Sequence, residues 1–226
     1  MDYNTAIEYT HSLLRFGSRP GLERINALLC ALGSPQKKLA AVHVAGTNGK
    51  GSVCVCLAKL FEQKGLKTGL FISPYIVNFR ERMQINSKFI SKVDYAEVAS
   101  EVRKASESLD KSLHPTEFEF VTAAALLWFS KTNCDVVVLE TGLGGRLDST
   151  NVFEAPLCTV ITSISTDHTA VLGDTTEKIA AEKCGIIKKG CPVVTCDSQL
   201  PEAMAVIEDT AQKLGAPLKK VKQEDI

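Results

Sequence analysis

The stretch AVHVAGTNGKGS, residues 41–52, passes from an apolar run through a glycine-rich turn into a helical pattern. We predict a buried strand over 41–45 and a helix from about Gly51 to Lys64. Glycines let a backbone fold around phosphate oxygens, and the N–H groups at a helix start supply positive potential. The stretch therefore predicts a nucleotide-binding loop, in which the lysine reaches the β- and γ-phosphates and a hydroxyl binds Mg²⁺. The residues of this loop are Gly46, Thr47, Asn48, Gly49, Lys50, Gly51 and Ser52.

The match to the general phosphate-loop pattern departs at two positions. Val44 stands where that pattern has its first glycine, and Gly51 separates Lys50 from the hydroxyl of Ser52. A glycine-rich turn that binds nothing is the alternative. The strand before the turn and the helix after it favour the phosphate loop.

Outward from this stretch, short apolar runs alternate with longer helical patterns, which is typical of an α/β fold with a mostly parallel sheet and flanking helices. We expect strands at 41–45, 68–72, 135–139, 157–162 and 192–195, and helices at 5–15, 22–32, 51–64, 117–131, 175–187 and 201–214. A further helix begins after a capping box of Ser91 and Asp94, and residues 75–90 are read as a loop with a short hairpin. The pattern predicts one domain over residues 1–226.

Composition excludes several classes of protein. The 226 residues carry 26 Lys and Arg against 26 Asp and Glu, so no global charge attracts nucleic acid or an anionic membrane. Eight cysteines without a Cys-x-x-Cys pair predict small buried apolar groups rather than a zinc site. No basic leader or membrane-length apolar run is present, and we expect a soluble cytoplasmic protein.

Further polar residues are expected where strands end. Glu140 follows the apolar run 135–139, so it is either a ligand-facing carboxylate or an exposed strand-end residue. The glycine-rich segment 142–148 is either a loop that closes over an anion through Arg146 or a plain surface loop. His168 either ligates a metal or satisfies a buried hydrogen bond. Lys183 is either a snorkelling lysine or an amine that forms a carbamate.

Several motifs, in order along the chain, resemble the folylpolyglutamate synthase and dihydrofolate synthase branch of the Mur ligase superfamily. They are HVAGTNGKGS at 43–52, SPY at 73–75, ER at 81–82, ETGLGGRLDSTN at 140–151, DH at 167–168 and EKCGI at 182–186. The segments 21–25 and 116–120 also match family motifs. The fold that this resemblance implies is a phosphate-loop NTPase-like Mur ligase central domain.

The resemblance implies an ATP-dependent ligase of folate biosynthesis and one-carbon metabolism, which joins L-glutamate to a folate or dihydropteroate carboxylate through an acyl phosphate. Residues 46–52 would hold the triphosphate of ATP. Ser52, Ser73 and Glu140 would bind the first Mg²⁺, and His168 with a carbamylated Lys183 the second. Lys50, His168 and Lys183 are the expected catalytic residues. The expected substrate contacts are Arg82, Phe118, Glu119, Phe120, Asp148, Ser149 and Thr150.

The family pattern also includes a C-terminal domain, and we expect this chain to be the N-terminal part of such a ligase, truncated before its nucleotide-binding domain is complete. Tyr75 stands where many members have histidine, and Ser149 where alanine is common. A monomer without nucleic-acid or membrane partners is expected. The alternatives are another Mur-type amino-acid ligase, or a nucleotide-binding remnant without ligase activity.

Overall fold

In the computed structural model, which describes residues 1–17, 19–165, 173–222 and 224, the described strands form one mixed eight-stranded sheet. The strands are β1 (Ala41–Ala45), β2 (Thr68–Phe71), β3 (Met83–Ile85), β4 (Lys88–Phe89), β5 (Val136–Glu140), β6 (Cys158–Ile161), β7 (Val193–Cys196) and β8 (Leu218–Val221). Their order is β4-β3-β2-β5-β1-β6-β7-β8. All neighbours are parallel except β2–β3 and β3–β4, so the predicted α/β class with a mostly parallel sheet is confirmed.

The helices largely follow the predicted ranges. They are α1 (Tyr3–Ser12), α2 (Glu23–Ala31), α3 (Lys50–Gln63), α4 (Lys92–Glu107), α5 (Glu117–Lys131), α7 (Thr176–Cys184) and α8 (Pro201–Lys213), with 3₁₀ turns at Leu13–Phe16, Pro35–Lys38, Phe79–Arg82 and Lys111–Leu113. The Asp94 N–H donates to Ser91 Oγ at 2.9 Å, which confirms the Ser91 half of the predicted capping box. The hairpin expected within 75–90 is β3–β4.

The last strand, β8, was absent from the sequence prediction. Its four residues do not alternate between buried and exposed, because Lys219 and Lys220 are both exposed between the half-buried Leu218 and Val221. Lysines of this kind are typical of an edge strand, where they oppose pairing with another chain. The apolar signal that identifies a central strand is therefore missing.

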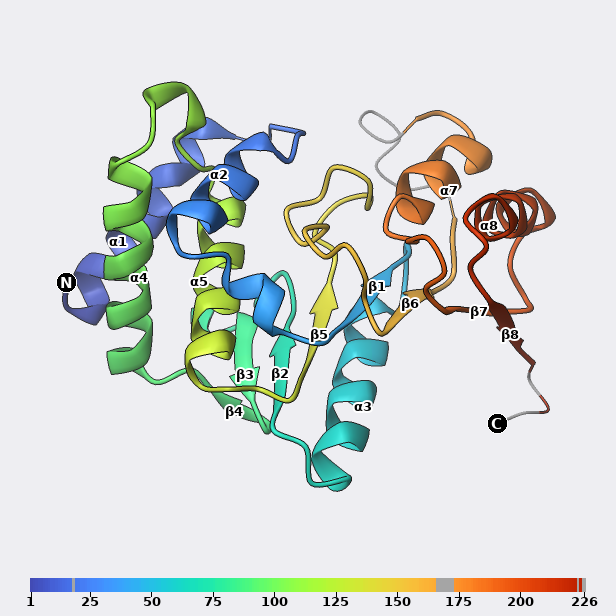
Figure 1. The fold of residues 1–226 in the computed structure, drawn as a ribbon, viewed down its shortest axis with the longest axis horizontal. Coiled ribbons are helices and arrows are strands. Elements are labelled where there is room, and N and C mark those ends of the chain that lie inside the picture. The colour runs from blue at the N-terminus through green and yellow to red at the C-terminus, as the bar shows by residue number, and fades with distance from the viewer. Residues whose placement is uncertain (18, 166–172, 223, 225–226) are drawn as a thin grey trace.

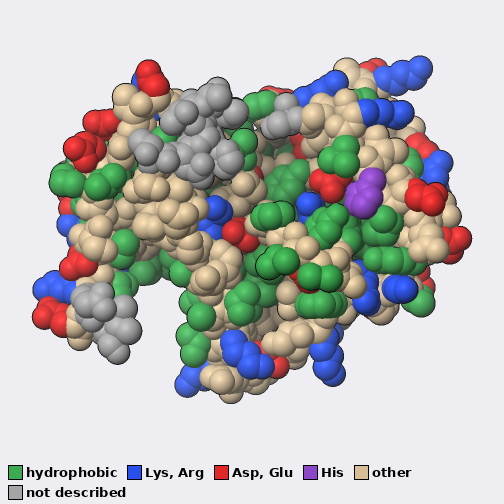
Figure 2. All heavy atoms as spheres, turned by 180° about the vertical axis from the view of Figure 1, so that it is seen from behind, with side chains coloured by type: hydrophobic (Ala, Val, Ile, Leu, Met, Phe, Trp, Pro, Cys, Tyr) green, Lys and Arg blue, Asp and Glu red, His purple; other side chains and the backbone are tan. Residues whose placement is uncertain are grey.

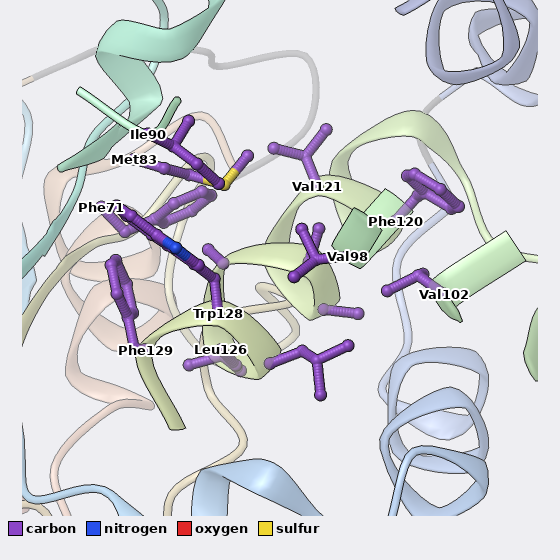
Figure 3. Close-up of a cluster of buried hydrophobic side chains, with 14 of the residues drawn as sticks. Phe71, Met83, Ile90, Val98, Val102, Phe120, Val121, Leu126, Trp128 and Phe129 are labelled. Carbon is purple, nitrogen blue, oxygen red and sulfur yellow. The ribbon is translucent and has the colours of Figure 1, made fainter. Parts of the chain in front are cut away.

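Helices cover both faces of the sheet. On one face lies α3, whose Cys54 belongs to the same buried cluster as Val42, Val44 and Val138. On the other face α1, α2, α4 and α5 gather beside β2 and β5, while α7 and α8 cover β6 and β7 (Figure 1). The larger core surrounds α5, whose residues 120–129 are all buried. In Figure 3, Phe71, Met83 and Ile90 lie together at one end of this cluster.

The surface carries charges of both signs. On the face in Figure 2, basic and acidic side chains are interspersed with apolar ones. Among the described helices, none is both long enough and apolar enough to cross a membrane.

The strand order places a crevice at the centre of the sheet. The chain leaves β1 toward β2 on one side, whereas β6 pairs with β1 on the other side. Ligands of α/β proteins bind at such reversals, outside the carboxyl ends of the strands. Here the ends of β1, β5 and β6 lead into residues 46–49, 141–151 and 162–165, which build the candidate site.

Candidate functional site

The phosphate-loop candidate, residues 46–49, joins β1 directly to α3. Gly46 has φ +148°, and a Cβ added to it would lie 1.8 Å from Thr162 Oγ1. Gly49 is the N-cap of α3 with φ +82°, in the left-handed region that favours glycine. Both glycines are therefore required by the path of the backbone, which passes close to the end of β6.

This loop is held against the segment that follows β6. The Thr47 N–H donates to the Ser163 carbonyl at 2.8 Å, and Thr47 Oγ1 donates to the Ser165 carbonyl at 3.1 Å. The half-buried Lys50 folds back and donates from Nζ to the Thr47 carbonyl at 3.1 Å. The loop is thus fixed by two bonds to the distant segment 163–165 and by one local bond from Lys50, with Asn48 and Gly49 exposed at its tip. Sequence reasoning missed the contribution of Ser163 and Ser165, although they directly follow a predicted strand.

Glu140 ends β5 as a buried carboxylate, only 5% exposed, so the exposed strand-end alternative is wrong. The Ser73 N–H donates to its Oε2 at 3.0 Å. Burial raises the pKa of Glu140, against the opposing effect of the Ser73 N–H and the Lys50 charge. A Cβ on Gly51 would lie 3.5 Å from Oε2, in ordinary van der Waals contact, so Gly51 lies directly beside the carboxylate.

Glu140 opens into a hollow of about 510 Å³ beside the start of α3, and both Ser52 and Ser73 line the same hollow. The three predicted ligands of the first Mg²⁺ are therefore brought together. All three supply oxygen, which is the donor that Mg²⁺ prefers. No group of three or more His, Cys, Asp or Glu side chains with metal-binding geometry occurs among the described residues. A Mg²⁺ ion commonly needs only one or two carboxylates, because phosphate and water oxygens complete its shell.

Lys183 lies near the end of α7 and is only 3% exposed, which rules out a snorkelling lysine. Its Nζ donates to the Gly46 carbonyl at 2.7 Å, so it contacts the phosphate loop from the opposite side to α3. Asp167 and His168 fall outside the described residues. The second metal site predicted from His168 and Lys183 stays a prediction.

A second cavity, of about 470 Å³, lies between the N-terminal helices and the loop 142–151. Four predicted substrate residues line this cavity: Arg82, Phe118, Asp148 and Ser149. Ser73 and Pro74, joined by a cis peptide bond, line both the cavity and the hollow beside Glu140. The two spaces therefore meet at one dipeptide.

The other three predicted substrate residues lie outside the lining. Glu119 is buried, forms the capping box of α5 with Thr116, and pairs with Arg24 at 3.0 Å. Phe120 is fully buried in the core, where its ring lies 5.4 Å from that of Tyr9. Thr150 is itself a residue of the loop 142–151 and is fully buried.

Cations and carboxylates are paired across the cavity wall. Arg82 is buried, lies 3.4 Å from Glu117, and places its guanidinium 5.2 Å from the Tyr75 ring centroid. Arg146 Nη2 donates to Glu182 at 2.7 Å. Sequence reasoning assigned no site role to Glu117 or Glu182, since a glutamate in a helix is most often a solvated residue.

The chain matches the Mur ligase middle domain over residues 44–212. It is 46% identical to dihydrofolate synthase/folylpolyglutamate synthase of Bacillus subtilis over 97% of this chain and 51% of that protein. It is 41% identical to folylpolyglutamate synthase of Lacticaseibacillus casei over 92% of this chain and 49% of that protein. A solved FPGS–AMPPCP–folate complex superposes with a TM-score of 0.90 at 39% identity, covering 97% of this chain and 54% of that one.

These findings confirm the family resemblance of the sequence motifs. The chain spans about half the length of the curated relatives that it matches.

Proposed function

Because this chain belongs to the Mur ligase middle-domain family, we propose that it carries the nucleotide- and acceptor-binding part of an ATP-dependent ligase that joins L-glutamate to a folate or dihydropteroate carboxylate. One observation carries the proposal. The hollow beside the phosphate loop and the cavity between the N-terminal helices and the loop 142–151 share Ser73 and Pro74, so a phosphate in one space and a carboxylate in the other would meet at this junction. The proposal treats residues 1–226 as one ATP-binding domain of a cytoplasmic, monomeric enzyme.

ATP is the proposed nucleotide, since a relative is solved with AMPPCP, an analogue of ATP. The N–H groups at the start of α3 would face its phosphates, whereas those of Thr47 and Asn48 already donate to the Ser163 carbonyl. Lys50 would exchange its bond to the Thr47 carbonyl for the β- and γ-phosphates.

Glu140, Ser52 and Ser73 would hold a Mg²⁺ ion at the junction of the two spaces. The ion supplies positive charge that offsets the repulsion between the γ-phosphate and the acceptor carboxylate. Lys183 and His168 are the proposed ligands of the second Mg²⁺ ion. The buried Lys183 amine lies 2.7 Å from the Gly46 carbonyl, in the loop that would hold the phosphates. In the proposed enzyme Lys183 would carry a carbamate, and His168 would be the other ligand of the second Mg²⁺ ion.

The proposed reaction has two steps. An oxygen of the acceptor carboxylate attacks the γ-phosphorus of ATP, and the bond to the β-phosphate oxygen breaks to release ADP. The amine of glutamate then attacks the acyl carbon, and phosphate leaves as the amide forms. The protein contributes by placing the two anions in line and excluding water from the junction.

The cavity is proposed as the acceptor site. Phe118 supplies an aromatic surface for a flat heterocycle, and Arg82 supplies a cation close to Ser73 and Pro74. Glu119 and Phe120 would act indirectly, by fixing the start of α5 and hence Phe118.

The proposal is tested by titrating the chain with Mg-AMPPCP and, separately, with folate and dihydropteroate, using calorimetry. Binding of both ligand classes is expected. Lys50→Ala should weaken binding of the nucleotide, and Phe118→Ala should weaken binding of the acceptor. In parallel, products of Mg-ATP, glutamate and each acceptor are analysed by mass spectrometry. A parallel reaction contains a cell-wall nucleotide precursor as the acceptor. Ligation to that precursor, and not to folate or dihydropteroate, would support another Mur-type ligase. Nucleotide binding without acceptor binding would overturn the proposed acceptor site.

A further inference from the structure

A buried chain of hydrogen bonds runs from the centre of the sheet to the cavity wall. His43, in the middle of β1, is 1% exposed, and its Nε2 lies 2.8 Å from Thr150 Oγ1. Thr150 Oγ1 in turn lies 2.6 Å from Asp148 Oδ1. Asp148 lines the cavity, whereas His43 and Thr150 lie behind it. We call His43, Thr150 and Asp148 the relay.

The direction of the hydrogen bonds in the relay follows from the number of protons that each group has. Asp148 accepts from the N–H groups of Thr150 and Leu143, at 2.9 and 2.8 Å, as well as from the Thr150 hydroxyl. Burial raises the pKa of Asp148, whereas the hydrogen bonds from the Thr150 hydroxyl and from the Leu143 and Thr150 N–H groups oppose that shift and favour the ionised, accepting carboxylate. A threonine hydroxyl has one proton to donate. Since that proton points to Asp148, the hydroxyl can only accept from His43.

His43 must therefore carry its proton on Nε2. Burial, together with the charge of Lys188, lowers the pKa of His43 to about 3, so the ring is neutral and has a single N–H. That N–H is directed away from Val42 and Val44, which point to the α3 face of the sheet. The tautomer is thus set by the bond to Thr150.

The relay holds a loop as well as a carboxylate. Asp148 Oδ2 accepts from Leu143, five residues earlier, so the carboxylate closes the loop 142–151 across its own base. Leu143, Arg146 and Ser149 of this loop all line the cavity. Asp148 accepts most of its hydrogen bonds from within the loop. The position of the Asp148 carboxylate is therefore set by these bonds and by His43, which fixes Thr150.

The geometry points to His43 as a positioning residue for the acceptor cavity: its Nε2–H holds Thr150, and through Thr150 it holds Asp148 and the loop 142–151. It acts from inside the sheet without touching the cavity. The inference rests on the proposed function, in that the cavity is taken as the acceptor site.

The first test needs no ligand. Hydrogen exchange of the Leu143 and Thr150 amides is measured in the whole chain for His43→Leu, which lacks the donor, and for His43→Gln, whose amide places an N–H near the Nε2 position. Roughly tenfold faster exchange is expected in His43→Leu, with recovery in His43→Gln, because one buried hydrogen bond is lost and then restored. Amides of residues 46–52 should be unchanged. Unchanged exchange at Leu143 and Thr150 would overturn the inference.

Two threonine variants keep the test decisive if His43→Leu does not fold. Thr150→Val removes the hydroxyl of the relay with little change in volume. Thr195→Val is the matched control, because the Thr195 hydroxyl is also buried but lies on β7, which does not pair with β1, and donates to the Ile161 carbonyl. Faster exchange in the loop is expected from Thr150→Val only. Equal acceleration in both variants would indicate general destabilisation and would overturn the inference.

The second test measures affinity for folate and for Mg-ATP. Folate binding should weaken about tenfold in His43→Leu and Thr150→Val, which corresponds to about 1.4 kcal/mol, while Mg-ATP affinity stays the same. Equal folate affinity in wild type and variants would overturn the positioning of the cavity. If the wild-type chain binds Mg-ATP but no folate, the proposed acceptor fails, and the exchange measurement alone decides the relay.

Discussion

Replacing Arg24 by methionine should destabilise the fold strongly. The Arg24 guanidinium donates from Nε to Glu119 Oε2 at 3.1 Å, and Nη2 lies 3.0 Å from Oε1. The side chains of Arg24 and Glu119 are only 12% and 2% exposed. Glu119 also accepts the Thr116 N–H at 2.7 Å in the capping box of α5. The pair therefore ties the start of α2 to the start of α5.

The expected cost follows from what each variant leaves behind. Removing one partner of a buried ion pair costs about 3–5 kcal/mol, because the other charge stays buried. In Arg24→Met the carboxylate keeps the Thr116 N–H and the positive end of α5, so we expect the lower limit, about 3 kcal/mol. Glu119→Gln keeps the capping box and should cost less, about 2 kcal/mol.

In the double variant Arg24→Met/Glu119→Gln neither charge is buried alone, so its cost should fall short of the sum by at least about 1.5 kcal/mol. A loss of about 3 kcal/mol in a chain of this size lowers Tm by roughly 6–12 °C.

Urea unfolding followed by circular dichroism measures these differences through the midpoint concentration at constant slope. Lys213→Met is the control, because its ion pair with Asp209 is 72% and 57% exposed and should contribute less than about 1 kcal/mol. Costs that add within about 0.5 kcal/mol in the double variant would refute the coupling, and a cost below 1 kcal/mol for Arg24→Met would refute the buried pair itself.

Three further predictions concern the loops of the site. Lys50→Ala should weaken Mg-ATP binding roughly 10–100-fold through loss of a charged donor, and unchanged affinity in calorimetry would count against the phosphate loop. Lys183→Ala should abolish ligation in the complete enzyme while Mg-ATP still binds, and added bicarbonate should restore nothing; ligation at the wild-type rate would remove Lys183 from the site. Glu81 accepts the N–H groups of Ile76, Val77 and Asn78 at 2.8, 3.1 and 2.6 Å, which lowers its pKa from 4.5. Because the folded-state pKa is the lower one, these bonds contribute fully above about pH 4.5 and are lost as pH falls further. The amide chemical shifts of residues 76–78 should change with this loss in an NMR titration. Chemical shifts that stay constant as pH falls below 4.5 would contradict the prediction.

The fold was predictable where the sequence carries a strong periodic signal. The run 135–139 is apolar at four of five positions because β5 is covered on both faces, and this places Glu140 at a strand end without further information. The helix 117–131 was predicted with the same first and last residue as α5, since a proline precedes it and apolar residues fill it.

The site was less predictable because several of its residues act through contacts between distant segments. The prediction placed Glu119 among the substrate contacts, although Thr116 three residues earlier is equally the signature of a capping box. Its ion pair with Arg24 joins residues 95 positions apart, and no local pattern reports such a pair. His43 likewise reads as part of a strand, since its partner Thr150 is 107 positions away.

The last turn of α7, which carries Lys183, connects the phosphate loop to the loop that lines the cavity. Lys183 Nζ donates to the Gly46 carbonyl at 2.7 Å, and the neighbouring Glu182 carbonyl accepts the Arg146 N–H of the cavity loop at 2.8 Å. A Cβ on Gly145 would lie 2.7 Å from the Lys183 carbonyl, so the loop and the helix end are in direct contact. Removing the amine therefore takes away an anchor of the phosphate loop as well as the proposed carbamate. If anchoring were its whole contribution, nucleotide affinity and ligation would fall together; loss of ligation with intact affinity requires a chemical contribution from the amine.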